Sequence, residues 1–154
     1  MVTIDSIMHK PVVTATPEEA IAQAAGRMRE AGVGAVVVVE NERVTGIFTE
    51  RDLVSVVAQG LDPAATPVGE AATRDVVTID SGSSWRACAE ALRDRGIRHV
   101  PIVNDGRPVG VLSARDFFSA AAEGFERYIE RARFDDQLRN NVDPYDHMGG
   151  SYGR

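Results

Sequence analysis

The sequence predicts an α+β (mixed α/β) fold in which two tandem β-α-β-β-α repeats form one module with a pseudo-twofold axis. The first observation is an internal duplication, because a shift of 64 residues aligns residues 4–60 with 68–124 without a gap. About fifteen aligned positions are identical, where composition alone gives roughly four or five. The second observation is that both copies alternate apolar residues at helical spacing with short β-branched runs. Because one copy alone would leave a face of its small sheet uncovered, we expect two small sheets packed between helices.

Each repeat is expected to open with an extended Val-Val-Thr segment, at residues 12–14 and 76–78. A helix follows in the first copy, where Thr16-Pro17-Glu18-Glu19 supplies an N-cap, a proline at the first helical position and a glutamate at the third. Gly32 is expected to end this helix. The apolar face of the helix is formed by Ile21, Ala24, Ala25 and Met28.

A β-hairpin and a second helix complete each repeat. The run Ala35–Val39 is typical of a buried strand, and Asn41-Glu42 then turns the chain back. The second copy has a stronger turn signal in Asp105-Gly106. Residues 61–67, with two prolines, form the linker between the copies. The expected strands span residues 35–39, 44–48, 100–103 and 109–112, and the second helices span residues 49–60 and 113–124.

The remaining residues differ from the repeats. A third helix is predicted by the helical spacing of Phe125, Tyr128, Ile129 and Ala132. It either lies back over the module's own surface or forms a contact with a second copy or another protein. The tail is polar and rich in glycine, so we expect it to be mobile. The predicted divisions are a first repeat (1–62), a second repeat (63–124), a C-terminal helix (125–138) and the tail (139–154).

Composition limits the function classes. A net charge of −6 does not favour binding to nucleic acid or to an anionic membrane. The absence of a long apolar run and the single cysteine, Cys88, suit a cytoplasmic protein, and Cys88 is expected to be a packed thiol on a helix. The sequence contains no nucleophile motif and no phosphate-binding loop, and its histidines lack metal-ligand spacing. We therefore expect neither an enzyme nor a metal site.

Several segments together resemble a known family. They are the opening Ile7-Met8 with residues 12–14, the runs 32–38 and 46–53, and the corresponding runs 76–78, 96–103 and 110–117. In this combination the chain resembles a stand-alone tandem pair of cystathionine-β-synthase (CBS) domains, also called a Bateman module. The resemblance covers roughly residues 4–124 and does not extend to the C-terminal helix.

The resemblance implies a regulatory or sensor module with two grooves between the repeats. The expected ligand is an adenine nucleotide or another adenosyl compound, with AMP or ATP foremost and ADP, NAD(H) or S-adenosylmethionine as the other choices. No cofactor is required, and the expected partners are a second copy of the chain and an unidentified protein. Groove 1 is expected to use Ile47, Thr49, Asp52, Arg74, Val76, Arg98, His99 and Val100. Groove 2 is expected to use Lys10, Val12, Ala35, Val36, Val111, Ser113 and Asp116.

The chemistry of these residues has two interpretations. A carboxylate can accept hydrogen bonds from a ribose diol, and a hydroxyl at a helix start suits phosphate. However, Thr49 with Asp52, and Ser113 with Asp116, also form ordinary capping boxes. An interaction or assembly protein with empty grooves is therefore the alternative. Of the two grooves, groove 1 is expected to bind phosphate better, because Arg98 and His99 stand where the first copy has Gly34-Ala35.

Overall fold

The computed structural model describes residues 3–139, so the expected tail beyond residue 139 lies outside the described residues. The chain divides into two compact units, one ending at Phe117 and the other beginning at Phe118. The first unit contains both sheets and all of the candidate site residues. The second unit consists, within the described residues, of the remainder of the last helix. No helix among the described residues is both long enough and apolar enough to cross a membrane.

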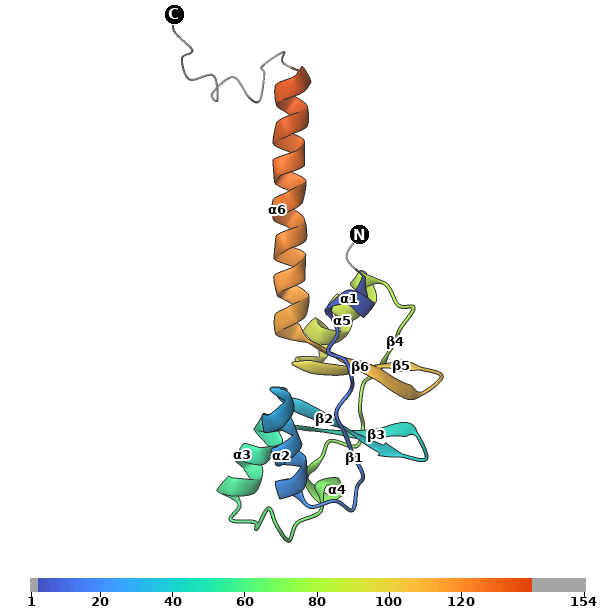
Figure 1. Ribbon diagram of the computed structural model, residues 1–154, viewed down its shortest axis with the longest axis vertical. Coiled ribbons are helices and arrows are strands. Elements are labelled where there is room, and N and C mark those ends of the chain that lie inside the picture. The colour runs from blue at the N-terminus through green and yellow to red at the C-terminus, as the bar shows by residue number, and fades with distance from the viewer. Residues whose placement is uncertain (1–2, 140–154) are drawn as a thin grey trace, which may run out of the picture. The chain divides into compact units, whose positions relative to one another are not determined.

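Each repeat forms the predicted three-stranded mixed sheet, in which a parallel pair is followed by an antiparallel hairpin. Repeat 1 comprises α1 (Ile4–Ile7), β1 (Thr14–Ala15), α2 (Ile21–Ala31), β2 (Ala35–Glu40), β3 (Arg43–Thr49) and α3 (Glu50–Ala58). Repeat 2 comprises α4 (Val68–Ala71), β4 (Ile79–Asp80), α5 (Trp85–Arg95), β5 (His99–Asn104), β6 (Arg107–Ser113) and α6 (Ala114–Arg139). Within the first unit the two sheets lie between helices (Figure 1).

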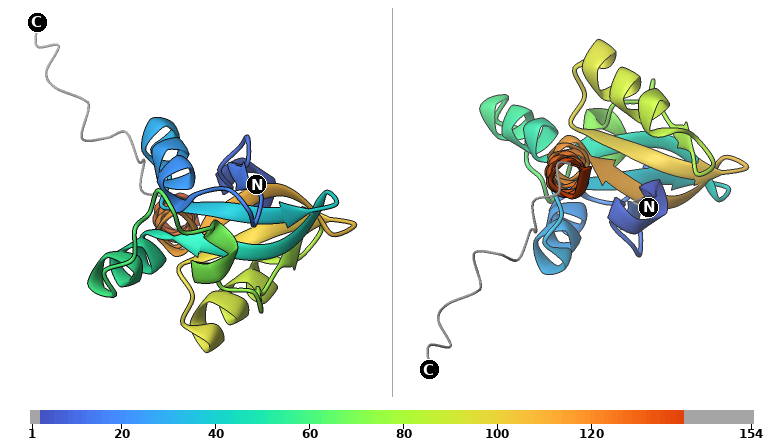
Figure 2. Two further views of the ribbon diagram at one scale, coloured as in Figure 1. Left: turned by 90° about the horizontal axis from the view of Figure 1, so that it is seen from below. Right: turned by 90° about the horizontal axis from the view of Figure 1, so that it is seen from above.

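The two hairpins follow the turn chemistry of the sequence. Asn41 and Glu42 both have positive φ, as do Asp105 and Gly106, which is typical of the tight turns that suit twisted strands. The hairpins extend toward the same side of the module (Figure 2). Their tips are joined, because Val44 N donates to Gly106 O at 3.2 Å and Glu42 pairs with Arg107 at 2.9 Å. The hairpin predictions are therefore confirmed, and the tips add a contact between the repeats.

The first helix of repeat 1 begins later than predicted. Thr16 to Glu19 forms a separate turn, in which the Glu19 carboxylate accepts a hydrogen bond from Thr16 N at 2.6 Å. Helix α2 starts at Ile21. Two of its free N–H groups are satisfied by the linker, because Ile21 N donates to Thr66 O at 3.0 Å and Ala22 N donates to Pro63 O at 2.9 Å. The prediction was wrong because these carbonyl groups come from residues more than forty positions away in the sequence.

The structure differs from the prediction in three further ways. The short helices α1 and α4 were not predicted, because four residues carry too little periodicity to be recognised. Strand β1 begins at Thr14, the last residue of its Val-Val-Thr segment, and β4 begins at Ile79, just after the second segment. Gly124 does not end a helix, and α6 continues through it to Arg139 as one helix. A glycine inside a helix costs only about 1 kcal/mol relative to alanine, whereas Gly60 after α3 has a φ of +69° and does accompany a helix end.

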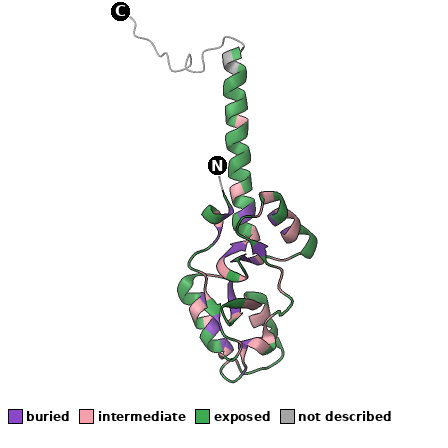
Figure 3. Ribbon diagram, turned by 90° about the vertical axis from the view of Figure 1, so that its right-hand side faces the viewer, coloured by how far each residue is buried: buried purple, intermediate pink, exposed green. Residues whose placement is uncertain are grey.

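The buried residues form two clusters, one for each sheet with the helices packed on it (Figure 3). Cys88 is fully buried in the cluster of repeat 2, and this burial raises the pKa of its thiol. The expectation of a packed thiol is therefore confirmed. The cluster of repeat 1 is centred on Ile21, Val36, Phe48 and Val56.

The clusters also show that the repeats exchange their opening segments. Ile4 and Met8, from the start of repeat 1, are buried in the cluster of repeat 2. Val68, from the start of repeat 2, is buried in the cluster of repeat 1. Ile4 and Val68 occupy equivalent positions under the shift of 64 residues, so the exchange is reciprocal.

Backbone hydrogen bonds fix the exchanged segments on the last strand of the opposite repeat. His9 N donates to Val111 O at 2.8 Å, and Val111 N donates back to His9 O at 3.3 Å. At the equivalent place Thr73 N donates to Ile47 O at 2.9 Å, and Ile47 N donates to Thr73 O at 3.0 Å. Each sheet is thus extended by a bridge from the other copy.

This exchange predicts that a residue before the first strand stabilises the second repeat. Ile4→Ala should lower the free energy of unfolding by about 2–5 kcal/mol, because it removes a buried side chain from the core of repeat 2. Chemical denaturation measures the change. As a matched control on the same helix, Asp5→Ala loses only an exposed ion pair with Lys10 and should cost less than about 1 kcal/mol. Equal small losses for both variants would contradict the exchange.

Candidate functional site

Two equivalent helix starts carry the polar residues of the predicted grooves. At the junction of β3 and α3, the Thr49 hydroxyl accepts a hydrogen bond from Asp52 N at 3.4 Å, and Asp52 Oδ2 accepts one from Thr49 N at 2.8 Å. At the junction of β6 and α6, the Ser113 hydroxyl accepts a hydrogen bond from Asp116 N at 3.0 Å. The capping interpretation is therefore confirmed for both hydroxyls, and it leaves open what else these residues bind.

Groove 1 is a cavity of about 280 Å³ beside the start of α3. One wall comes from repeat 1 and the other from repeat 2, as the duplication predicts. Of the eight residues predicted for this groove, six line the cavity, and they are Ile47, Thr49, Asp52, Val76, Arg98 and His99. Asp52 thus caps α3 and at the same time borders an open cavity.

Two predicted residues of groove 1 lie elsewhere. Val100 is fully buried in the core of repeat 2, because successive side chains of a strand point to opposite faces and its neighbour His99 takes the groove face. Arg74 directs its guanidinium to the carbonyl of Gly69, with N–O distances of 3.1 and 3.3 Å. The side chains of Arg74 and Val100 therefore do not line this cavity.

The cavity also includes residues that sequence reasoning missed. Arg95 ends helix α5 just before Gly96, whose φ is +59°. Thr73 and Asp75 belong to the exchanged segment. The sequence alone does not place Thr73 and Asp75 in this cavity. That placement follows only from the exchange of opening segments, in which Thr73 takes the position equivalent to His9. The ionisable residues of the groove, apart from His99, balance in formal charge: Arg51, Arg95 and Arg98 against Glu50, Asp52 and Asp75.

Groove 2 is much smaller, with a volume of about 100 Å³. Among its predicted residues, four line the cavity, and they are Ala35, Val111, Ser113 and Asp116. Three do not, for separate reasons. Val36 is fully buried in the core of repeat 1, Val12 lines a different cavity beside Glu19 and Arg27, and Lys10 pairs with Asp5 at 2.9 Å.

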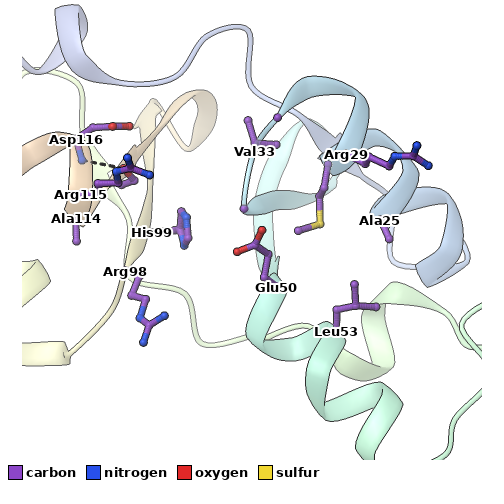
Figure 4. Close-up of a pocket in the computed structure, with 14 residues that line it drawn as sticks. Ala25, Arg29, Val33, Glu50, Leu53, Arg98, His99, Ala114, Arg115 and Asp116 are labelled. Atoms are coloured by element: carbon purple, nitrogen blue, oxygen red, sulfur yellow. Dashed lines mark hydrogen bonds between the residues drawn. The ribbon is translucent and has the colours of Figure 1, made fainter.

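A wide cleft of about 960 Å³ lies between the repeats and adjoins both grooves. It shares Arg98 with groove 1, and Ser113 and Asp116 with groove 2. Figure 4 shows Glu50 of α3 directed toward His99 of β5, with Arg98 beside them. Under the shift of 64 residues, these three correspond to Ala114, Ala35 and Gly34. Three residues that break the pseudo-symmetry therefore lie where the repeats meet.

The pKa of His99 is shifted by its surroundings in the site. It lines groove 1, groove 2 and the central cleft. Burial lowers the pKa of its imidazole below the ordinary value of 6.5, and the positive charge of Arg98 acts in the same direction. The carboxylates of Glu50 and Asp116 oppose this shift. At neutral pH the ring is therefore neutral and can donate one hydrogen bond and accept another.

No group of three His, Cys, Asp or Glu side chains suited to a metal ion is present within residues 3–139.

Comparison with known proteins identifies the architecture. The family model for the CBS domain matches the chain twice, over residues 4–59 and 68–123. The chain belongs to the CBS domain family. The two matches coincide with the two repeats, so the resemblance seen in the sequence is confirmed as a tandem CBS pair.

Relatives of this CBS pair differ in length. An uncharacterized protein of Methanopyrus kandleri is 35% identical over 118 residues, which cover 75% of this chain and 60% of that protein. The present chain thus spans less than two thirds of that relative. It matches 82% of a second relative, hypoxic response protein 1 of Mycobacterium tuberculosis, at 30% identity.

Two solved structures with this fold contain adenosyl ligands. A CBS domain protein of Pyrobaculum aerophilum complexed with AMP superimposes with a TM-score of 0.69 at 30% identity, covering 75% of this chain and 89% of that one. A CBS domain pair in complex with 5′-methylthioadenosine and S-adenosyl-L-methionine superimposes with a TM-score of 0.71 at 26% identity, covering 80% of this chain and 97% of that one. These likenesses confirm the fold, and the ligands belong to those proteins.

Proposed function

We propose that this CBS pair is a regulatory module that binds an adenine nucleotide, AMP or ATP foremost, in groove 1. The observation that carries the proposal is the composition of that cavity. A hydroxyl and a carboxylate at the start of α3, Thr49 and Asp52, face Arg98 of the other repeat across about 280 Å³. This volume is near the lower end of the roughly 300–1,000 Å³ typical of small-molecule sites. The AMP and S-adenosylmethionine complexes of related CBS proteins support the same ligand class.

Each residue has a chemical role in this proposal. The Asp52 carboxylate accepts hydrogen bonds from the ribose diol, as acidic residues of dinucleotide-binding folds do. The Thr49 hydroxyl and the N-terminus of α3 favour a phosphate group, because free N–H groups and the positive end of the helix dipole meet there. Arg98 binds the same phosphate from the opposite repeat with its planar guanidinium group. The backbone beside Val76 and Ile97 borders the space left for the adenine.

Signalling needs more than binding. The ligand has to bind one arrangement of the module more tightly than another, since only differential affinity shifts a conformational equilibrium. Groove 1 suits this requirement because its two walls belong to different repeats. In the proposal the shifted arrangement is recognised by a separate protein, and the module itself carries out no reaction.

The alternative function is that of an assembly protein with empty grooves, and one observation favours it. Val54 and Val57 on helix α3 are 68% and 66% exposed, so this helix presents apolar surface to solvent. A second copy of the chain would remove this surface from water, and we propose such a homodimer under either function. Sedimentation tests it: a particle of 16.6 kDa, the mass of one chain, would contradict the homodimer.

The central prediction concerns Asp52 and its equivalent Asp116. AMP or ATP at one hundred times its dissociation constant should stabilise the wild-type protein by about 2.7 kcal/mol in a thermal shift. Asp52→Ala should weaken binding by about 10- to 150-fold, which corresponds to the roughly 1.5–3 kcal/mol of hydrogen bonds to a charged group. Asp116→Ala is the matched control, because it removes the equivalent carboxylate from groove 2 and should leave this affinity unchanged.

Titration calorimetry separates the two roles of Asp52. The substitution also removes the bond from Thr49 N, so each variant is checked for folding before binding is measured. Unchanged affinity in folded Asp52→Ala would leave the residue as a helix cap only. No stabilisation by AMP, ATP, NADH or S-adenosylmethionine would favour the assembly function instead.

A second prediction isolates the phosphate contact. Arg98→Ala should lower the affinity for ATP by at least about tenfold, because charge-assisted hydrogen bonds to phosphate are lost. The affinity for adenosine, which has no phosphate, should change by less than about twofold. The matched control is Arg74→Ala, which removes the same charge from a side chain bonded to Gly69 outside the cavity. Equal losses for ATP and adenosine in Arg98→Ala would remove Arg98 from the phosphate site.

A further inference from the structure

Helix α6 carries an exposed apolar stripe in the part that belongs to the second unit. Most residues of α6 from Phe118 onward are exposed (Figure 3). Phe125 is 64% exposed and Tyr128 is 69% exposed. Most of the stability of a helix in a protein comes from packing of its apolar face, and an isolated helix is only marginally stable in water. A partner that buries these rings would therefore stabilise the helix.

The stripe follows the spacing of a coiled coil. Positions 118, 125 and 132 are seven residues apart and positions 121 and 128 lie between them, which is the a and d pattern of a heptad repeat. Each of these positions holds an aromatic residue or an alanine, and in order they are Phe118, Ala121, Phe125, Tyr128 and Ala132. The next d position is Asp135, so the apolar seam ends after Ala132. The seam is therefore that of a short coiled coil.

The charges beside the seam identify a second copy of the chain as the partner. In a parallel pair of helices, a g residue of one helix lies beside the e residue of the following heptad of the other. Arg131 is a g residue and Asp136 is the e residue of the following heptad. Both side chains are exposed, and neither forms an ion pair within residues 3–139 of its own chain. A twofold pair of α6 helices therefore brings opposite charges together twice.

The same positions favour the parallel orientation. In an antiparallel pair, g residues lie beside g residues and e residues beside e residues, so Arg131 and Asp136 would not meet. The other flanking positions of the seam are Ala122, Gly124 and Ile129. None of these three carries a charge, so a parallel pair places no like charges side by side along its apolar seam.

We propose that two copies of the chain associate through a short parallel coiled coil of α6, with Phe125 and Tyr128 in its core and Arg131 beside Asp136 of the second copy. This contact is separate from the exposed valines of α3. It also requires no ligand, because none of the residues that line groove 1 belongs to the seam.

Disulfide cross-linking of the full chain tests the contact. Ala132→Cys places a thiol in the seam, where a parallel pair brings the two copies of position 132 together. Glu130→Cys is the matched control, because position 130 lies on the opposite face of the same helix. Under mild oxidation Ala132→Cys should form a covalent dimer at least about tenfold faster than Glu130→Cys, because paired helices raise the effective concentration of the second thiol. Both positions are exposed in the single chain, and the native Cys88 is fully buried.

Charge reversal tests the register of the pair. In the Ala132→Cys background, Arg131→Asp alone or Asp136→Arg alone should slow the cross-linking, because like charges then meet at both flanks. An equimolar mixture of the two variants should form the mixed dimer as fast as Ala132→Cys does without them, because the reversed charges match again. Mass spectrometry of the covalent dimers distinguishes the mixed dimer from the two homodimers.

The outcomes decide between the possible partners of the stripe. Equal cross-linking of Ala132→Cys and Glu130→Cys would overturn the coiled coil, as expected if the stripe is covered by another part of the chain, by a different protein or by an antiparallel second copy. A mixture that pairs no faster than the single charge variants would overturn the parallel register. If sedimentation shows a homodimer and both cross-linking tests fail, the contact through α6 is wrong and the one proposed for α3 stands.

Discussion

The structure depends on the exchange of opening segments between the two repeats. His9 is hydrogen-bonded to the last strand of repeat 2, and Thr73 to the last strand of repeat 1. Helices α1 and α4 bury Ile4 and Val68 in the opposite cores. Neither repeat can therefore complete its core alone. The exchange also determines the composition of groove 1, since the segment that begins at Thr73 carries Asp75 and Val76 to the wall opposite Asp52.

Duplication gives this module two repeats of the same fold whose sequences have diverged. Three of the differences are Glu50, Arg98 and His99, which stand where the other copy has a small residue. All three line the cleft where the repeats meet. Their position means that a change of one side chain alters both grooves, as the lining by His99 illustrates.

Much of this fold could be predicted because its signals are local. The turns at Asn41 and Asp105 and the left-handed glycines after α2 and α5 are determined by neighbouring residues. The start of α2 was predicted wrongly because it depends on the distant carbonyl groups of Pro63 and Thr66. The side chain of Arg74 lies outside groove 1 because it binds the carbonyl of Gly69. Val36 and Val100 are buried in the two cores because adjacent residues of a strand face opposite sides.

We propose that one nucleotide is bound by both repeats at once. Hydrogen exchange of the intact chain with saturating AMP tests this proposal, because protection reports where opening of the backbone is suppressed. We expect slower exchange in two separate segments, residues 47–53 at the start of α3 and residues 95–99 at the start of β5, with residues 111–116 little changed. Protection confined to one repeat, or centred on residues 111–116, would contradict it.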